Sequence, residues 1–390
     1  MRSLWNDRVA CNYKSDLSLR VYSSNLLGRS DELVLHGGGN TSIKSEVDGE
    51  EILFVKGSGW DLVSIKEEGF APVRLQTLLD MVKLETLSDI DMVASQKKAM
   101  IDPSAPNPSV EAILHALIPF KVVDHTHADA IVTISNSENG KAHIKSLFPN
   151  FLIVPYVMPG FVLAKRIYEM TQWYDWEHCE GIILHNHGIF TFDNDAKESY
   201  QKMIEAVSKA EQFLDDEAHI DIPWEMRPIE YDITTLQNEI SKAKGYETTV
   251  KLNTSPIAQI YASQPNLREF ATRGVLTPEH IIRTKRVPLI IEDEDIQTAL
   301  NDYIDEYNRY FETHATTEIA LNPAPNYAVI KDIGIVLFGK SEKETNILND
   351  IIEHTMIAVL RADKLGGYES ISIADSFEME YWELEQMKLK

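Results

Sequence analysis

Apolar positions recur at helical spacing in several parts of the chain. This spacing predicts amphipathic helices over residues 74–86, 109–118, 195–219 and 343–365. Pro106, Pro108 and Ser109 are typical start signals for the second helix, and Gly366-Gly367 ends the last one.

Short apolar runs bounded by glycine and other turn residues predict strands. Residues 32–43 predict a strand, a tight glycine turn and a second strand, and residues 51–57 predict another short strand. The runs 121–135 and 181–192 predict buried strand regions. Residues 327–338 predict a hairpin that turns near Asp332-Ile333-Gly334.

The order of these elements predicts two domains. Strands alternate with helices through the first part of the chain, which indicates an α/β fold. The stretch 220–235 contains proline and has no periodicity, so we interpret it as a boundary. Beyond it the chain is mostly helical to about residue 310, before the predicted hairpin. We therefore expect a first domain over residues 1–235 and a C-terminal α+β extension over 236–390.

Composition and charge limit the classes of partner. Hydrophobic residues make up 44% of the 390 residues, as in a folded globular protein, and the net charge is −24. That charge repels nucleic acid and anionic membranes, so we expect neither as a partner. An anionic substrate would need a local binding device. No apolar run reaches the ~18 residues of a membrane span, and the N-terminus lacks an apolar signal core. We expect a cytoplasmic protein.

Histidines offer better metal ligands than the cysteines do. Cys11 and Cys179 are the only cysteines, too few for a disulfide framework or a thiolate zinc site. In a strand, His125 and His127 would point to the same face, so both imidazoles could meet one ion. His187, in the run His185-Asn186-His187-Gly188, is a third candidate. Three histidines with an open position are typical of a catalytic zinc site, and buried core histidines are the alternative.

A carboxylate and two glycine turns accompany the histidines. Glu111 begins an apolar helix, where a carboxylate is favoured by the helix dipole; beside a metal it could instead move a proton. We expect His115, one turn further on, to be a packing residue. The turn at 36–42 and the turn at 56–59 expose backbone N–H groups and hydroxyls that could hold a phosphate. The candidate phosphate-binding residues are Gly39, Asn40, Thr41, Ser58, Gly59 and Ser109.

Five motifs in order resemble the class II aldolase/adducin family over about residues 10–220. They are Gly-Gly-Asn40-Thr41-Ser42, Ser58-Gly59, Pro108-Ser109-Val110-Glu111, His125-Thr126-His127 and Asn186-His187-Gly188. The resemblance implies an α/β/α fold with a central, mainly antiparallel sheet. It also implies that His125, His127 and His187 bind zinc or another divalent metal and that Glu111 is the acid/base residue. Family members are commonly tetramers, so a homo-oligomer is expected.

The C-terminal part resembles the aldolase half of bifunctional rhamnulose-1-phosphate aldolase/dehydrogenase proteins. The similar motifs are Thr272-Arg273-Gly274, Thr277-Pro278-Glu279-His280, Arg283-Thr284-Lys285 and the run from Glu380 to Gln386. This resemblance implies a zinc-dependent aldolase that cleaves a ketose 1-phosphate, such as rhamnulose 1-phosphate, to dihydroxyacetone phosphate and an aldehyde such as L-lactaldehyde. The partner would be a small sugar phosphate.

Two alternatives stay open within the same family. Some relatives epimerise or dehydrate sugar phosphates, and adducin's head domain is a non-catalytic interaction module. A basic group, Arg273, His280, Arg283, Lys285 and Arg286, also stands out in the acidic chain. Surface ion pairing is our interpretation of this group, and a place in the active site is the alternative.

Overall fold

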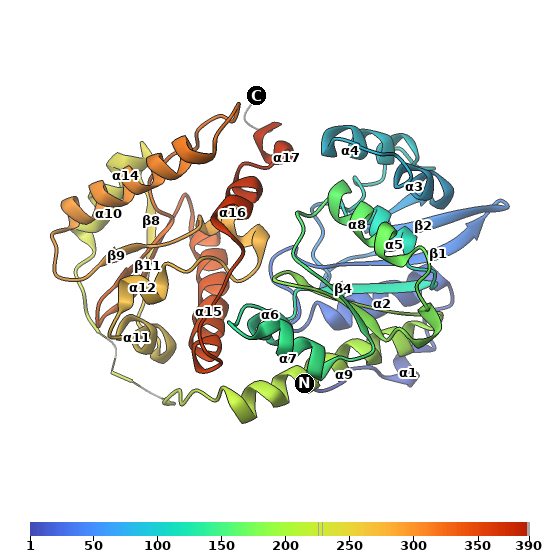
Figure 1. Ribbon diagram of the computed structural model, residues 1–390, viewed down its shortest axis with the longest axis horizontal. Helices are drawn as coiled ribbons and strands as arrows, with labels where there is room; N and C mark the ends of the chain where they lie inside the picture. Colours follow the sequence, from blue (N-terminus) through green and yellow to red (C-terminus); the bar gives the residue numbers. More distant parts are fainter. Residues whose placement is uncertain (225, 228, 388–390) are drawn as a thin grey trace. The chain divides into compact units, whose positions relative to one another are not determined.

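The computed structural model describes residues 1–224, 226–227 and 229–387 (Figure 1). The chain divides into two compact units, Met1–Ser135 with Gly140–Phe213, and Asn136–Asn139 with Leu214–Lys390. Positions 225 and 228 of the predicted boundary stretch lie outside the described residues, and the boundary at residue 235 stays a prediction. No helix in the described part of the chain is long and apolar enough to cross a membrane.

In the first unit, seven strands of the described residues form one sheet in the order β3-β2-β1-β4-β7-β6-β5. Their bounds are β1 Asn40–Val47, β2 Glu50–Lys56, β3 Phe70–Arg74, β4 Val122–Thr126, β5 Phe151–Val154, β6 Gly181–Leu184 and β7 Gly188–Asp193. Neighbouring strands are antiparallel except β5 and β6, which are parallel. The expected mainly antiparallel sheet is confirmed.

Helices cover both faces of this sheet (Figure 1). Helices α3, α5 and α8 share one apolar cluster with Leu53 and Val73, whereas α2 and α9 lie on the face that carries Ile43 and Val122. The bounds of the helical segments are α1 Asp7–Ala10, α2 Asp16–Leu27, η1 Glu67–Gly69, α3 Leu75–Met81, α4 Asp89–Lys98, α5 Ala112–Leu117, α6 Asp129–Ser135, α7 Gly140–Leu147, α8 Phe161–Thr171, η2 Trp176–His178 and α9 Ala196–Glu217. The α/β/α layering is confirmed.

Strand β4 crosses the middle of the sheet and is buried at every position. Because side chains alternate between faces along a strand, Asp124 and His125 point to opposite sides. Arg20 of α2 contacts Asp124 through Nη2 and Oδ1 at 2.6 Å, and both side chains are fully buried. The Ser199 hydroxyl of α9 donates to Asp124 Oδ2 at 2.6 Å. His125 therefore faces the α5 side of the sheet.

In the second unit, four strands of the described residues form a sheet in the order β8-β11-β10-β9. Helices α11 and α15 pack on one face with Val329 and Leu337, and α10 and α14 pack on the other with Ala328 and Val336. The expected α+β extension is confirmed. The bounds are α10 Thr234–Lys244, β8 Thr249–Asn253, α11 Pro256–Ala262, α12 Leu267–Ala271, η3 Pro278–His280, α13 Ile281–Thr284, β9 Leu289–Ile291, α14 Ile296–His314, β10 Tyr327–Ile330, β11 Gly334–Gly339, α15 Glu342–Lys364, α16 Ile373–Glu380 and α17 Glu383–Gln386.

Most predicted elements are present, and three were wrong in part. The strand predicted before the glycine turn, at the start of 32–43, instead forms turns, in which the amides of Leu33 and Val34 bond locally to Ser30 O at 3.0 and 3.2 Å. The predicted strand region 121–135 ends at Thr126 and continues as α6, which is buried on all sides and so shows no helical periodicity. The mostly helical stretch after residue 236 also contains the short strands β8 and β9.

Candidate metal centre

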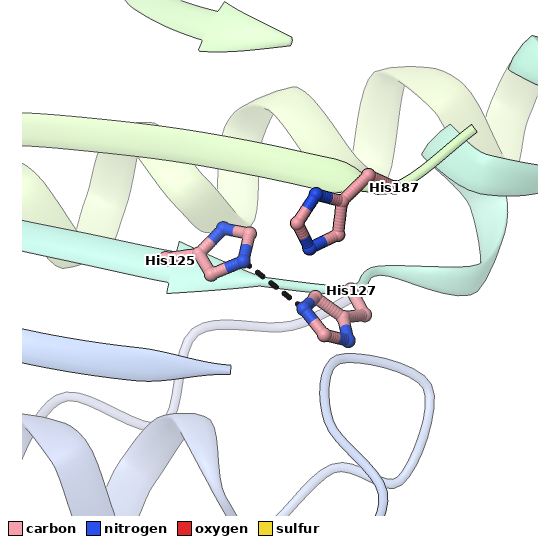
Figure 2. A group of neighbouring side chains, drawn as sticks. All are labelled: His125, His127 and His187. Carbon is pink, nitrogen blue, oxygen red and sulfur yellow. Dashed lines mark hydrogen bonds between the residues drawn. The ribbon is translucent and has the colours of Figure 1, made fainter. Parts of the chain in front are cut away.

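Three imidazoles meet where strand β4 ends and its neighbour β7 begins (Figure 2). His125 and His127 lie at the end of β4, with their Nε2 atoms 3.0 Å apart. His187 lies in the turn between β6 and β7, and β7 pairs directly with β4. One ligand atom from each ring lies within 4.8 Å of the others, so the group could hold a metal ion. His185 is not part of it and contacts Asn186 Oδ1 through Nδ1 at 2.7 Å.

A backbone carbonyl sets the tautomer of His125. Its Nδ1 lies 3.1 Å from the carbonyl oxygen of Ile189. Because a carbonyl oxygen only accepts, Nδ1 carries the proton and Nε2 presents a lone pair to the other two rings. Such a contact both orients a metal-ligating histidine and strengthens it as a ligand.

Glycine gives the imidazoles room. A β-carbon on Gly188 would lie 2.4 Å from Thr126 O and 3.1 Å from His125 Cε1. A β-carbon on Gly38 would lie 2.9 Å from Leu35 O and 3.4 Å from His127 Nδ1. The backbones of the glycine-rich turn and of the β6–β7 turn therefore approach the group more closely than other residues would allow.

Glu111 lies beside the imidazoles, at the N-terminus of α5. It is 6% exposed and makes no side-chain capping bond to the helix. Its Oε2 lies 3.5 Å from His125 Nε2, and its Oε1 lies 3.9 Å from His187 Nε2. Asn40 donates from Nδ2 to Glu111 Oε2 at 2.6 Å. The carboxylate is thus held facing the imidazoles by a neutral side chain.

Asn40 is part of a buried chain of hydrogen bonds. Its Oδ1 accepts from His115 Nε2, and His115 Nδ1 lies 2.8 Å from the Ser42 hydroxyl. Burial, assisted by the charges of His125, Lys44 and Arg20, lowers the pKa of His115 well below its usual value, so the ring is neutral. Its Nε2 carries the proton because the amide oxygen can only accept. His115 was expected to be a packing residue, and the structure instead connects it to Glu111 through Asn40.

The candidate phosphate residues are only partly brought together. Ser58 and Ser109 lie on adjoining segments, since Ser58 N donates to Asn107 O at 2.8 Å and Ser109 N donates to Lys56 O at 3.0 Å. Gly59 belongs to the first of these segments. Thr41 is different, because its hydroxyl contacts Ser24 of α2 at 2.8 Å, on the far face of the sheet.

Gly39 and Asn40 lie at the start of β1, against the histidine strand. A β-carbon on Gly39 would lie 2.7 Å from His125 O. The side chain of Asn40 is engaged by Glu111 and His115, as described above. The hydrogen bonds from Glu111 through Asn40 to His115 do not involve four of the candidate phosphate residues. These residues are Gly39, Ser58, Gly59 and Ser109.

Lys56 joins the two turns and was missed from the sequence. Its Nζ donates to Gly37 O at 3.0 Å, and the side chain is buried. Burial lowers the pKa of Lys56 to about 8, against the opposing charges of Asp61 and Glu111. A lysine at the end of an apolar strand, directly before a Gly-Ser-Gly turn, is the signal that could have identified it.

The donor set fits a divalent transition metal. Three neutral imidazoles with an adjacent carboxylate are an ordinary ligand set for zinc, and they leave positions for oxygen ligands. Softer thiolate chemistry is excluded at this place, since Cys11 is exposed and Cys179 lies in an apolar cluster.

The fold and this histidine group together define a class II aldolase scaffold. Residues 21–214 match the family described as Class II Aldolase and Adducin N-terminal domain, and residues 230–389 match Aldolase class II, second domain. The chain belongs to the class II aldolase family.

Two relatives illustrate the match. The N-terminal class II aldolase domain of a conserved protein from Thermoplasma acidophilum is 39% identical, with a TM-score of 0.51, and the match covers 55% of this chain and 99% of that one. The protein named uncharacterized oxidoreductase YuxG, from Bacillus subtilis (strain 168), is 30% identical over 420 residues, and the match covers 100% of this chain. The chain spans 60% of that relative's length.

Proposed function

We propose that the protein is a zinc-dependent aldolase that cleaves a ketose 1-phosphate to dihydroxyacetone phosphate and an aldehyde. Rhamnulose 1-phosphate, which would release L-lactaldehyde, is the proposed substrate. The observation that carries the proposal is the buried Glu111 carboxylate beside three convergent imidazoles, 3.5 Å from His125 Nε2. A non-catalytic interaction module would have no need for a buried carboxylate in this position.

His125, His127 and His187 are the proposed ligands. A bound divalent cation would supply Lewis-acid stabilisation of the negative charge that develops on the substrate oxygens. The Ile189 carbonyl keeps the His125 lone pair directed to the cation position. Histidine ligands that are already oriented before the metal binds lose little conformational freedom when it does.

Glu111 is the proposed acid/base residue. Cleavage breaks the C3–C4 bond, the C4 hydroxyl loses its proton to become the aldehyde carbonyl, and C3 of the other product takes up a proton. Glu111 would exchange that C3 proton through Oε1, because Oε2 is already held by the Asn40 amide at 2.6 Å. Asn40 and His115 would keep the carboxylate in place without adding a charge that shifts its proton affinity.

Gly39, Ser58, Gly59 and Ser109 are the proposed phosphate contacts, together with Lys56. Ser58 and Ser109 would contribute their hydroxyls, since their backbone N–H groups donate to Asn107 O and Lys56 O, and Gly39 and Gly59 would contribute backbone groups. Lys56 adds an ammonium group that bonds to the first turn and directly precedes the second. A local positive group is needed because the net charge of −24 repels a dianion at long range.

The test is a lyase screen over several ketose 1-phosphates, with released dihydroxyacetone phosphate measured by a coupled dehydrogenase. Purified protein should contain about one zinc per chain by elemental analysis, a chelator should abolish the release, and added zinc should restore it. An epimer formed without dihydroxyacetone phosphate would replace this proposal with an epimerase. Protein that holds no metal and cleaves nothing would favour an interaction module.

A further inference from the structure

A polar hollow is lined wholly by residues of the C-terminal unit. Its volume is about 240 Å³. Its lining includes three lysines and one carboxylate, in a chain whose net charge is −24. The lining residues are Lys244, Tyr246, Ile282, Lys285, Leu321, Asn322, Ala324, Asn326, Lys340 and Glu380. Positive groups are therefore concentrated here although acidic residues dominate the protein as a whole.

Lys285 is held in an unusual backbone conformation, with φ 63° and ψ 174°. Residues with a β-carbon avoid this region, which is occupied mainly by glycine. The side chain is nevertheless buried, and its Nζ donates to Asn322 O at 2.7 Å. Nζ also lies 3.6 Å above the Tyr307 ring and 3.9 Å from Glu380 Oε1. The backbone strain at Lys285 is thus accompanied by a fixed position of its ammonium group at the hollow. A turn alone would not need a buried lysine here, whereas an anion-binding site would use one.

Lys244 and Lys340 complete the positive lining. Lys244 Nζ donates to Asn326 Oδ1 at 2.6 Å, and Lys340 Nζ lies 5.4 Å from the Tyr246 ring centre. Among the described residues, neither lysine makes an ion pair within 4.0 Å. Burial lowers the pKa of both Lys244 and Lys285 to about 8, against the opposing charges of Glu344 and Glu380 respectively. An anion bound in the hollow would add a further opposing charge to the three lysines.

Glu380 does not cancel the three lysines. Its Oε1 accepts from the Tyr307 hydroxyl at 2.8 Å, and Tyr307 contacts the Tyr381 hydroxyl at 2.8 Å. Burial raises the pKa of Glu380, against the opposing charge of Lys285. Tyr307 holds the carboxylate in place, and one carboxylate among three lysines leaves the lining with an excess of positive charge.

We propose that this hollow binds a small organic oxyanion, a phosphate or carboxylate group carried by a molecule of few carbons. Lysine ammonium groups bind such oxyanions through charge-assisted hydrogen bonds. Ile282, Leu321 and Ala324 give the hollow an apolar side that fits a carbon skeleton. The volume of about 240 Å³ is below the ~300 Å³ at which pockets for larger ligands begin, which favours a small ligand. The residues of the hollow belong to the C-terminal unit, and those of the candidate metal centre belong to the first unit.

Site-resolved acetylation of the intact protein tests this proposal. Limiting acetic anhydride is applied at constant ionic strength with chloride, inorganic phosphate, glycerol 1-phosphate or malonate, and the modified lysines are counted by mass spectrometry. At ten times the dissociation constant, a bound anion should slow acetylation of Lys244 and Lys340 roughly tenfold. Lys242, whose side chain is 72% exposed, should react equally in all four solutions. The anion that protects best identifies the oxyanion source.

A matched pair of variants makes the result specific. Lys244→Gln should abolish the protection of Lys340, whereas Lys242→Gln on the same helix should retain it. Because Lys340 is exposed and reports independently, the test does not require the buried Lys285 to be altered. The proposal is overturned if no oxyanion slows acetylation of Lys244 and Lys340 more than chloride does, or if Lys340 is protected equally in both variants.

Discussion

At the scale of single residues, the orientation of the side chains in the candidate metal centre depends on neighbouring groups whose hydrogen-bonding role is fixed, such as a carbonyl oxygen that only accepts. The Ile189 carbonyl can only accept, so His125 presents its Nε2 lone pair. The Asn40 amide donates to Glu111 and accepts from His115. His125 and Glu111 are therefore each oriented by an uncharged group.

Replacing Glu111 tests the acid/base role. Glu111→Gln keeps the shape and the contact to Asn40 but cannot exchange a proton, so turnover should fall by roughly 10² to 10⁴-fold. Zinc content should stay near one per chain, because the three histidines are unchanged. Turnover at the wild-type rate would exclude Glu111 from proton transfer.

Replacing Gly188 tests the space around the imidazoles. The β-carbon of Gly188→Ala would lie 2.4 Å from Thr126 O, so strand β4 must shift, at a cost of about 1–3 kcal/mol. Metal affinity should fall with stability. Gly49→Ala is the control, because Gly49 has φ 82° and open space around its β-carbon. It should lose about 1–2 kcal/mol through backbone strain and keep its metal affinity. Equal metal affinity in both variants would contradict the prediction.

Lys56 should give substrate binding a pH dependence. Burial lowers its pKa to about 8, so the ammonium group loses its proton as the pH rises through that value. A phosphate then loses its positive partner, and KM should rise above pH 8 while kcat changes little. In Lys56→Met, KM should be higher at pH 7 and flat across this range. Lys83→Met, at an exposed lysine, should follow the wild-type pH profile. If KM rose with pH in Lys56→Met as it does in the wild type, the effect would belong to another group.

At the scale of elements, the packing of α2 on β4 includes a buried ion pair. Arg20→Met would leave Asp124 buried without its partner and should lower the free energy of unfolding by about 3–5 kcal/mol. Lys121→Met is the matched control, because Lys121 forms an exposed pair with Asp16 of the same helix. Its cost should stay below about 1 kcal/mol. Urea unfolding measures both, and similar losses would mean that burial of the pair is unimportant.

Elements with a strong period could be predicted from the sequence, and those without one could not. Helices α9 and α15 and the β10–β11 hairpin lie close to their predicted bounds, because each has one apolar face or an evident turn. Helix α6 is buried from Ala130 to Ser135 and has no exposed polar face, so it resembles a buried strand in sequence. Strands β8 and β9 have only 5 and 3 residues, too few to establish a period.

The candidate site was predictable in its ligands and less so in its supporting contacts. Spacing alone predicted His125 and His127 on one face, and the sequence motifs also named His187 and Glu111; the structure brings all four side chains together. The contact of His115 with Asn40 spans 75 positions, so no local pattern indicates it. Thr41 appeared equivalent to its neighbours in the turn, but alternation along β1 directs its hydroxyl to the far face.

At the scale of the whole molecule, charge should act on the approach of substrate. The net charge of −24 repels a phosphate ester at long range. Salt weakens this repulsion, because the Debye length shortens to about 10 Å at 0.1 M ionic strength. We expect kcat/KM to rise a few-fold between ~0.01 and ~0.15 M ionic strength with kcat unchanged. A steady fall in kcat/KM would mean that local positive groups, such as Lys56, dominate the encounter.

The basic group noticed in the sequence has more than one role. Arg273 forms the kind of ion pair that was expected, with its Nη1 3.4 Å from Asp363 Oδ1. Lys285 differs from that expectation, because it is buried above Tyr307 and lines the hollow of the C-terminal unit. Arg273 and Lys285 are therefore close in sequence, but their side chains have different surroundings.

Strand β4 places an ion-pair carboxylate and an imidazole at successive positions, Asp124 and His125. Inserting or deleting one residue upstream within this strand would exchange the two faces, presenting the carboxylate to the cation site and the imidazole to Arg20. Such a change would damage stability and catalysis together. Natural variation in β4 should therefore be restricted to substitutions that preserve the length of the strand.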